Sequence, residues 1–301
     1  MSLPQPIFIL ASPRSFTSLI CAMLGRHPQL YGVPELNLFT AETMEQLVQR
    51  MKGSRLQQQH GLLRTIAQLY AGEQTLLSIE MARRWMFHRL DRSTGEVYIE
   101  LCHKVTPLRI IDKSPSYPMK SVHLNRIRET FPGAYYLHLI RHPITQGKSV
   151  MNLSGGILAQ ICRSIDYSTT PYTLDPQYLW YRMQNKILDF LSTVPSHQQM
   201  RLRGEDILNA PESHFEEICK WLNLDWNESI YEAMLRPQDS PYACIGPYGA
   251  RFGNDPNFLK SPTFRYRPIA PSELEGALPW RDDDKGLLPP VMKLAQELGY
   301  E

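Results

Sequence analysis

Short apolar runs alternate with longer amphipathic segments along most of the chain. Residues 6–11 and 135–140 are apolar runs of strand length, and residues 108–111 and 200–203 are two further strand-like segments. A run that is apolar at successive positions is typical of a strand that is buried on both faces of a parallel sheet. Apolar residues at helical spacing predict helices over residues 16–25, 122–131, 177–191 and 214–222. A further helix is expected after residue 143, through Ser149 and Met151.

Strands that alternate with helices predict an α/β fold in which a central parallel sheet is flanked by helices. The length of 301 residues fits one large domain, and we expect residues 1–301 to form it. Two segments, 155–175 and 236–290, are rich in Pro, Gly, Ser and Tyr and are predicted to be irregular. Such segments are often lids or substrate-binding loops, and simple wrapping of the surface explains the second one as well.

Composition narrows the classes of function. A net charge of +2 is too small for nucleic-acid binding by bulk electrostatics. No apolar run approaches the length that spans a membrane, and no basic region followed by a long apolar stretch begins the chain. Five cysteines without a C-x-x-C pair favour reduced thiols over disulfides or zinc. We expect a cytoplasmic protein that binds neither nucleic acid nor membrane, and no His/Asp/Cys spacing predicts a metal site.

The turn between the first strand and the first helix is a candidate anion site. Backbone N–H groups and the positive end of the helix dipole point into such a turn. Arg14 adds a guanidinium that can hold two oxygens, and Thr17 and Ser18 add hydroxyl donors. An ordinary helix start with Ser15 or Thr17 as the N-cap explains the same residues equally well.

The same turn differs from the P-loop that binds nucleoside triphosphates. That loop reads G-x-x-x-x-G-K-[ST], with its lysine on the outer phosphates and its hydroxyl on magnesium. Here both glycines are missing and Arg14 stands near the lysine position. The turn therefore suits an anion of lower charge that needs no metal. A P-loop kinase or NTPase is the main enzymatic alternative, and a catalytically silent nucleotide-binding protein is another.

Five segments, in order, resemble the sulfotransferases that use 3′-phosphoadenosine-5′-phosphosulfate (PAPS). The family's 5′-phosphosulfate loop, P-R-S-G-T-T or P-K-S-G-T-T, is similar to Pro-Arg-Ser-Phe-Thr-Ser at residues 13–18. Its strand ending in R-x-P, with a serine eight residues after the arginine, is similar to the segment that holds Arg141 and Ser149. The remaining matches are an x-K-x-P element at 111–115, an R-x-E-D-L segment at 203–208 and a late G-x-P loop at 253–258.

The resemblance spans residues 6 to about 260 and implies a three-layer, P-loop-like fold with the C-terminal loops over the active site. It implies that Arg141 and Ser149 bind the 3′-phosphate of PAPS, and that Lys113 lies near the bridging oxygen and the transferring sulfuryl group. PAPS is then a co-substrate and no metal takes part. The expected nucleotide-binding residues are Arg14, Ser15, Phe16, Thr17, Ser18, Arg141, Ser149, Arg203 and Gly253.

The resemblance also implies a catalytic base. Tyrosylprotein and related sulfotransferases carry a catalytic glutamate at the place of Glu35, in Val-Pro-Glu-Leu. We expect Glu35, Lys113 and Arg14 to be the catalytic residues, although a structural or surface glutamate is the alternative for Glu35. Among the histidines we expect a structural cap at His27, a place in the 3′-phosphate turn for His142, and solvated or core positions for His103 and His123.

Bacterial sulfotransferases of natural-product pathways, including those in polyketide synthases, are the most similar in their motifs. Pro-Glu-Leu, Asp-Lys-Ser-Pro-Ser-Tyr and His-Leu-Ile-Arg-His-Pro carry this likeness. It implies an acceptor hydroxyl on a small-molecule natural product or on a hydroxyacyl chain tethered to a carrier. Aromatic residues of the late loops are candidates to line an apolar acceptor pocket or to pack the loop: Tyr242, Tyr248, Phe252, Phe264 and Tyr266.

Two positions depart from the family pattern. Phe16 replaces the usual glycine, so the loop lacks the freedom of glycine at positive φ. Gly204 stands where the family often has a tyrosine. Any aromatic stacking on the adenine must therefore come from another residue.

Overall fold

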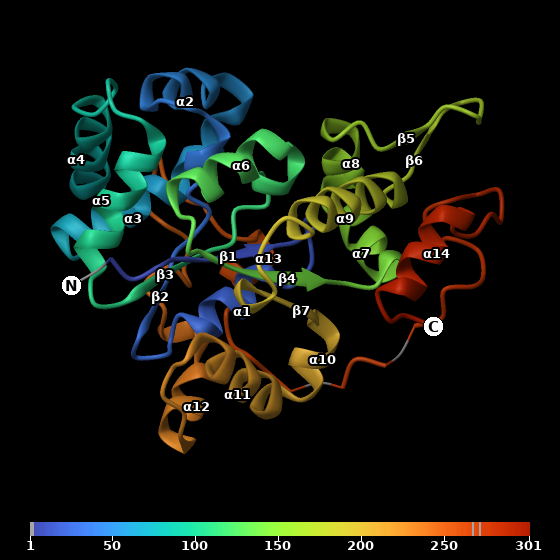
Figure 1. Cartoon of the computed structure of the whole chain (residues 1–301). Coiled ribbons are helices and arrows are strands. Elements are labelled where there is room, and N and C mark those ends of the chain that lie inside the picture. Colours follow the sequence, from blue (N-terminus) through green and yellow to red (C-terminus); the bar gives the residue numbers. More distant parts are fainter. Residues whose placement is uncertain (1–2, 267, 271) are drawn as a thin grey trace.

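The computed structural model describes residues 3–266, 268–270 and 272–301. Its central sheet has five strands, all paired in parallel, in the order β2-β3-β1-β4-β7 (Figure 1). This confirms the expected parallel sheet, and adds one short edge strand that the apolar pattern did not predict. The strands are β1 (Ile7–Leu10), β2 (Leu30–Gly32), β3 (Arg109–Asp112), β4 (Tyr135–Ile140) and β7 (Gln199–Arg203).

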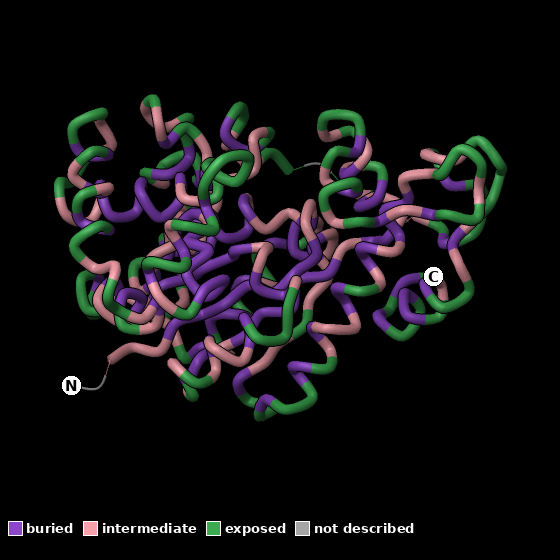
Figure 2. Tube along the Cα trace, turned by 90° about the horizontal axis from the view of Figure 1, so that it is seen from above, coloured by how far each residue is buried: buried purple, intermediate pink, exposed green. Residues whose placement is uncertain are grey.

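Strand β1 lies in the middle of the sheet because both of its faces are apolar. Ile7 and Ile9 pack into the core on one side, whereas Phe8 and Leu10 pack into the core on the other. Successive side chains of a strand point to opposite faces, so an unbroken apolar run serves two cores at once. All four residues are buried. Buried residues fill the middle of the molecule, and exposed residues lie mainly at its periphery (Figure 2).

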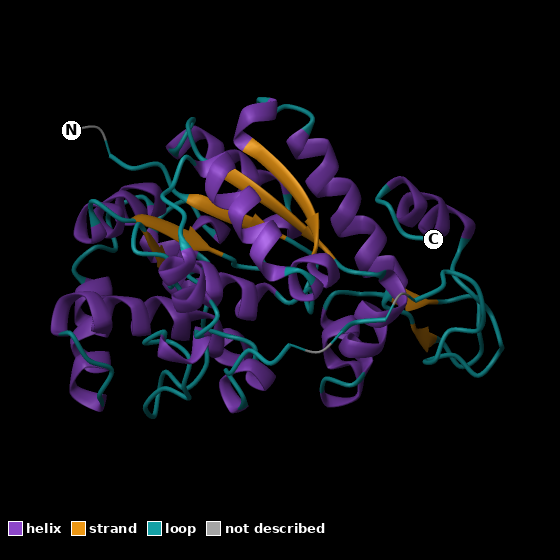
Figure 3. Ribbon diagram, turned by 90° about the horizontal axis from the view of Figure 1, so that it is seen from below, coloured by secondary structure: helices purple, strands orange, loops and turns teal. Residues whose placement is uncertain are grey.

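Helices cover both faces of the sheet and give three layers (Figures 1 and 3). One face carries α1 (Thr17–Leu24), α10 (Gly204–Asn209), α11 (Pro211–Leu222) and α12 (Glu228–Met234). The other carries α3 (His60–Ala71), α4 (Leu76–Phe87), α5 (Thr94–Val105), α6 (Ser121–Thr130) and α9 (Gln177–Leu191). The predicted helices are confirmed to within a few residues. Helix α11 begins earlier than predicted because Pro211 is tolerated in a first helical turn.

Further helices lie outside these two layers or close the edges of the sheet. They are α2 (Met44–Arg50), α7 (Pro143–Met151), α8 (Ile157–Ile161), α13 (Pro256–Lys260) and α14 (Pro289–Glu297). Short 3-10 turns are η1 (Leu38–Thr40), η2 (Gly53–Gln59), η3 (Tyr117–Met119), η4 (Ser154–Gly156), η5 (Ser196–Gln198) and η6 (Pro237–Asp239).

The two segments that were predicted to be irregular are only partly so. Segment 155–175 contains α8 and an antiparallel pair of short strands, β5 (Ile165–Asp166) and β6 (Thr173–Leu174), so the prediction was wrong there. Segment 236–290 contains η6, α13 and the start of α14, and its other described residues form neither helix nor strand. Positions 267 and 271 of this segment lie outside the described residues.

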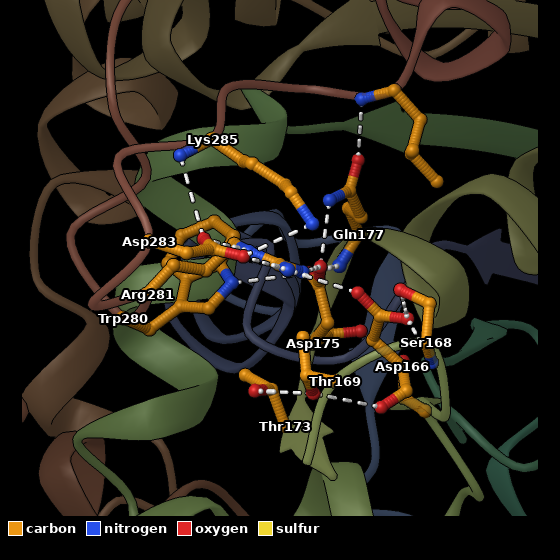
Figure 4. A network of polar contacts seen from close by, with 12 residues as sticks. Asp166, Ser168, Thr169, Thr173, Asp175, Gln177, Trp280, Arg281, Asp283 and Lys285 are labelled. Carbon is orange, nitrogen blue, oxygen red and sulfur yellow. Dashed lines mark hydrogen bonds and ion pairs between the residues drawn. The ribbon is translucent and has the colours of Figure 1, made fainter. Parts of the chain in front are cut away.

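Arg281, in segment 236–290, forms ion pairs that connect this segment to the β5–β6 hairpin (Figure 4). Its guanidinium pairs with Asp175 at 2.6 Å and with Asp166 at 2.9 Å, and its side chain is only 3% exposed. Trp280 donates from Nε1 to Asp175 at 3.0 Å. The Trp280 ring also packs on Gly147 of α7, where a Cβ would lie 2.4 Å from the ring. The hairpin therefore depends on a cation more than a hundred residues away, and no local pattern reveals it.

Replacement of Arg281 by alanine is expected to destabilise the fold by about 3–5 kcal/mol, because it leaves buried carboxylates without their cation. The free energy of unfolding in urea measures this loss. Arg84→Ala is the matched control, since Arg84 pairs with Glu80 on the exposed surface of α4 and should change stability by about 0.5 kcal/mol or less. Equal losses in the two variants would contradict the anchoring role of Arg281.

Candidate active site

The carboxyl ends of all five strands meet at one edge of the sheet, because the strands are parallel. Arg14 follows β1, Glu35 follows β2, Lys113 follows β3, Arg141 follows β4, and Arg203 ends β7. In open α/β sheets ligands bind at this edge. A cleft of about 680 Å³ opens there. Of these five residues, Arg14, Glu35 and Arg141 line the cleft.

The turn after β1 leaves the start of α1 free for an anion. Phe16 is the N-cap of α1, and no side chain in the described part of the chain caps this helix. The alternative that Ser15 or Thr17 caps it is therefore wrong. Arg14 and Phe16 both have positive φ, 70° and 60°, although neither is glycine. Such backbone costs about 1–3 kcal/mol per residue and is found mainly at functional sites.

Two buried hydroxyls in this turn do not face the cleft. The Oγ atoms of Ser12 and Ser15 are buried and have no hydrogen-bond partner among the described residues, and neither residue lines the cleft. Thr17 and Ser18 do line it. The N–H groups of α1 and the Arg14 guanidinium suit a phosphate or phosphosulfate group.

The turns that carry Arg14 and Arg141 are in direct contact. Arg141 donates from Nη1 to the carbonyl oxygen of Arg14 at 2.6 Å. Arg14 in turn donates from Nε to Ser149 Oγ at 3.2 Å. A second cavity, of about 310 Å³, lies between them and is also lined by Thr145 and Lys148 of α7. Three cations and two hydroxyls around one small cavity are typical of a phosphate site.

Burial changes the titration of this cationic pair. It lowers the pKa of Arg141 to about 10, while the carboxylate of Glu205 raises that pKa and the charge of Arg14 lowers it further. Burial also lowers the pKa of Arg14. At neutral pH Arg141 remains protonated and offers a fixed positive charge to an anion.

Lys113 and Glu35 form an ion pair at the inner end of the cleft. Lys113 donates from Nζ to Glu35 Oε1 at 2.8 Å and to Ser18 Oγ at 2.9 Å. The Lys113 side chain is fully buried, whereas the Glu35 side chain is 29% exposed. A buried ammonium requires an anionic partner, so this pair is a structural necessity as well as a candidate for chemistry. The structure thus joins two residues that the sequence places 78 positions apart.

A buried aspartate shapes the turn that carries Lys113, and the sequence reasoning gave it no role. Asp112 accepts from the backbone N–H and hydroxyl of Ser114 at 2.9 and 2.7 Å, and from the Tyr117 hydroxyl at 2.7 Å. Burial raises the pKa of Asp112 to about 6. Ser114 Oγ also accepts from Asn37 N at 3.0 Å, which ties the Glu35 turn to the Lys113 turn.

Residues 252–258 of the late loop line the cleft. Gly253 has a φ of 105°, and a Cβ there would lie 2.6 Å from the Cα of Gly61, so a side chain at this position is excluded. Its carbonyl oxygen accepts from Glu35 N at 2.8 Å. Asp255, which the sequence reasoning missed, pairs with Arg14 and caps α13. An Asp before Pro at a helix start signals the cap but not the ion pair.

Arg203 is not brought to the cleft. It lines neither of the two cavities. Its guanidinium pairs with Asp206 at 2.6 Å and donates to the carbonyl oxygen of Gly299. This contact secures the C-terminal tail instead. The expected nucleotide-binding role of Arg203 therefore has no support from its position.

The histidines hold structural positions. His27 Nδ1 accepts from the backbone N–H of Gln29, and its Nε2 bonds to the Asp225 carbonyl oxygen. Gly25 is the C-cap of α1, so His27 holds a structural position but does not cap the helix. His142 lies in the turn that carries Arg141, caps α7 and lines neither cavity. His123 is buried and His103 is exposed, and neither of them lines the two cavities.

The apolar wall of the cleft differs from the prediction. Of the five late aromatic residues only Phe252 lines it. Tyr242 is buried against Tyr31, and Tyr248 is largely exposed. Phe264 and Tyr266 do not line the cleft. The other apolar residues of the wall lie outside that set and include Leu19, Met119, Leu153, Leu158, Ile161 and Phe258.

Within residues 3–266, 268–270 and 272–301, no three His, Cys, Asp or Glu side chains are grouped so as to hold a metal ion. In the same residues no helix has both the length and the apolar character needed to cross a bilayer.

Comparisons with known proteins agree with this geometry. A family model described as the sulfotransferase family matches residues 6–228. The sulfotransferase domain from the curacin biosynthetic pathway is 25% identical, with a TM-score of 0.78 over 100% of this chain and 99% of that chain. The sulfotransferase domain from the Synechococcus PCC 7002 olefin synthase is 26% identical, with a TM-score of 0.74 over 100% and 97%. No protein of curated function matches.

These likenesses confirm the three-layer, P-loop-like α/β fold and the resemblance to bacterial natural-product sulfotransferases. The family match covers the turns that carry Arg14, Glu35, Lys113 and Arg141. The chain belongs to the sulfotransferase family.

Proposed function

We propose that this sulfotransferase takes its sulfuryl group from PAPS, transfers it to a hydroxyl group and releases 3′,5′-adenosine bisphosphate (PAP). The contact between the Arg14 and Arg141 turns carries the proposal, because it sets two anion sites side by side on one cleft. A ligand with a phosphate at each end of one nucleoside matches this pair. The turn at residues 13–18 holds the 5′ end, and Arg141 with Ser149 holds the 3′-phosphate.

The proposed chemistry uses the residues at the inner end of the cleft. PAPS supplies a sulfur that accepts attack by an oxygen nucleophile. The acceptor oxygen forms a bond to sulfur, the bond between sulfur and the bridging oxygen breaks, and its electron pair leaves with the 5′-phosphate. Arg14, Lys113 and the N–H groups at the start of α1 stabilise that developing charge. Lys113 holds Oε1 of Glu35, and we assign Oε2 to accept the proton of the acceptor hydroxyl.

The walls of the cleft support an apolar acceptor. Leu158 and Ile161 of α8 and Phe258 of α13 line it together with Glu35. A mostly apolar cleft with few polar groups orients a ligand by burying its hydrocarbon part. We therefore assign the acceptor as a hydroxyl on an apolar natural product or on a carrier-tethered hydroxyacyl chain. The origin of the two similar domains, from a curacin pathway and an olefin synthase, supports this assignment.

The alternatives have less support. A P-loop kinase or NTPase needs a lysine on the outer phosphates, and this turn offers Arg14 paired with Asp255 instead. A catalytically silent nucleotide-binding protein accounts for the buried Lys113 and its partner, but it does not require the Glu35 carboxylate to line the cleft.

Calorimetric titration tests the co-substrate. PAP is expected to bind without magnesium and about tenfold or more tighter than adenosine 5′-phosphate, because the 3′-phosphate adds charge-assisted hydrogen bonds to Arg141. Magnesium–ATP should bind more weakly than PAP. Arg141→Ala should remove the preference for PAP over adenosine 5′-phosphate. No heat on addition of PAP to the wild-type chain would overturn the assignment.

Replacement of Lys113 by alanine is expected to lower kcat by roughly a hundred- to thousandfold, because one preorganised donor to the leaving group is lost. Labelled PAPS and a hydroxylated acceptor measure turnover, and thermal melting reports whether the fold persists. Lys220→Ala, at an exposed position of α11, is the matched control and should keep wild-type turnover. Near-normal turnover of a folded Lys113→Ala variant would remove this lysine from the mechanism.

Replacement of Glu35 by glutamine keeps an oxygen for Lys113 but removes the base. The variant is expected to bind PAP within a few-fold of wild type and to lose about 10²- to 10⁴-fold in kcat. Titration with PAP and turnover with labelled PAPS are measured side by side. Glu228→Gln, exposed at the start of α12, is the control and should behave as wild type. Retained turnover in Glu35→Gln would show that another group takes the proton.

A further inference from the structure

Phe16 occupies a backbone position that favours glycine. Its φ of 60° and ψ of 8° lie in the left-handed region, directly after the phosphate-binding Arg14 and Ser15. Glycine adopts this conformation without a steric cost, whereas an aromatic residue does not. A strained conformation persists only where surrounding contacts hold it. The contacts of the Phe16 side chain should therefore identify what stabilises this strained backbone.

The Phe16 ring lies against the guanidinium of Arg141. The guanidinium carbon is 4.2 Å from the ring centroid, within the range of a cation–π contact. Two other contacts hold the same guanidinium at its edge: Nη1 donates to the Arg14 carbonyl oxygen at 2.6 Å, and Nε donates to Thr145 Oγ1 at 3.2 Å. The ring supplies the third constraint, against a face of the group, so the three together fix both its position and its plane.

The ring has room because residue 204 has no side chain. A Cβ on Gly204 would lie 2.6 Å from Cδ2 of Phe16 and 3.5 Å from the carbonyl oxygen of Ile140. Gly204 is buried where β7 passes into α10. The Phe16 ring thus fills the space between the turns after β1, β4 and β7. The two departures from the family pattern, Phe16 and Gly204, therefore belong together, because the ring of one fills the space left by the other.

We propose that Phe16 is a positioning residue that orients Arg141 for the 3′-phosphate of the nucleotide, and that Gly204 is required because the ring takes its space. The proposal rests on the proposed function, in which Arg141 binds that phosphate. Arg141 sits beside a second cation, Arg14, and burial disfavours its charge. The electron-rich face of Phe16 offsets both effects without offering a competing anion.

The role of Phe16 is tested by the affinity ratio, which is the affinity for PAP divided by the affinity for adenosine 5′-phosphate. Phe16→Gly relieves the backbone but removes the ring, so PAP binding should weaken by about 3- to 30-fold. Binding of adenosine 5′-phosphate, which lacks the group that Arg141 holds, should stay within twofold. Phe16→Leu, which keeps bulk but no π face, should lower the ratio in the same way, and Phe16→Tyr should restore it.

Two double-variant cycles separate this role from general stability. In an Arg141→Ala background, Phe16→Gly should leave PAP affinity unchanged, because the ring acts through Arg141. Gly204→Ala should weaken PAP binding in the wild type, since the new Cβ displaces the ring, and should be harmless beside Phe16→Gly. Thermal melting of every variant reports stability independently.

The outcomes distinguish this proposal from the proposed function. A wild-type chain that fails to bind PAP would contradict the proposed function, and this role with it. If the wild type binds PAP normally and Phe16→Gly leaves the affinity ratio unchanged, the positioning role of Phe16 is contradicted, whereas the proposed function is not. An equal loss for PAP and adenosine 5′-phosphate would also overturn it, because the ring would then act on the part that both ligands share.

Discussion

The parallel pairing of β1 with a strand on each side is the constraint on which the site depends. Phe8 pairs with Asp112 of β3, and β1 continues two residues further to Leu10. Leu10 pairs with His138 of β4, which continues two residues further to Ile140. The three strands therefore end in a staggered series, and their turns deliver Lys113, Arg14 and Arg141 at successive heights along one edge. A shift of register would separate these groups.

The site suits an anion because three cations are clustered in it, and not because the whole chain is strongly basic. The chain carries a net charge of only +2, yet Arg14, Lys113 and Arg141 lie within one region. Each cation has a partner from the protein: Asp255 for Arg14, Glu35 for Lys113, and a carbonyl oxygen for Arg141. Buried cations without partners would destabilise the fold. The same contacts hold the donors in fixed orientations, which is what electrostatic catalysis requires.

The sequence predicts those strands and turns whose structure depends only on a short stretch of chain. The apolar runs at 6–11 and 135–140 are strands because each is buried on both faces, and the turns that follow them carry recognisable motifs. Contacts between distant residues were beyond this reasoning. The hairpin at 165–174 depends on Arg281, and the Arg14–Asp255 pair depends on a late loop. The apolar wall of the cleft likewise combines residues of separate elements that no motif marks, such as Leu19 of α1, Met119 of η3 and Leu158 of α8.

Phe16 shows how a departure from a local rule can be consistent with the whole structure. Backbone preference disfavours a phenylalanine at a φ of 60°. The family pattern often has a tyrosine where this chain has Gly204. Each departure removes the objection to the other, because the ring occupies the space that Gly204 leaves and rests on Arg141. Local inconsistencies of this kind are expected where function requires them. The left-handed backbone at Phe16 is then the conformation that places its ring against the Arg141 guanidinium, which also bonds to the turn of Arg14.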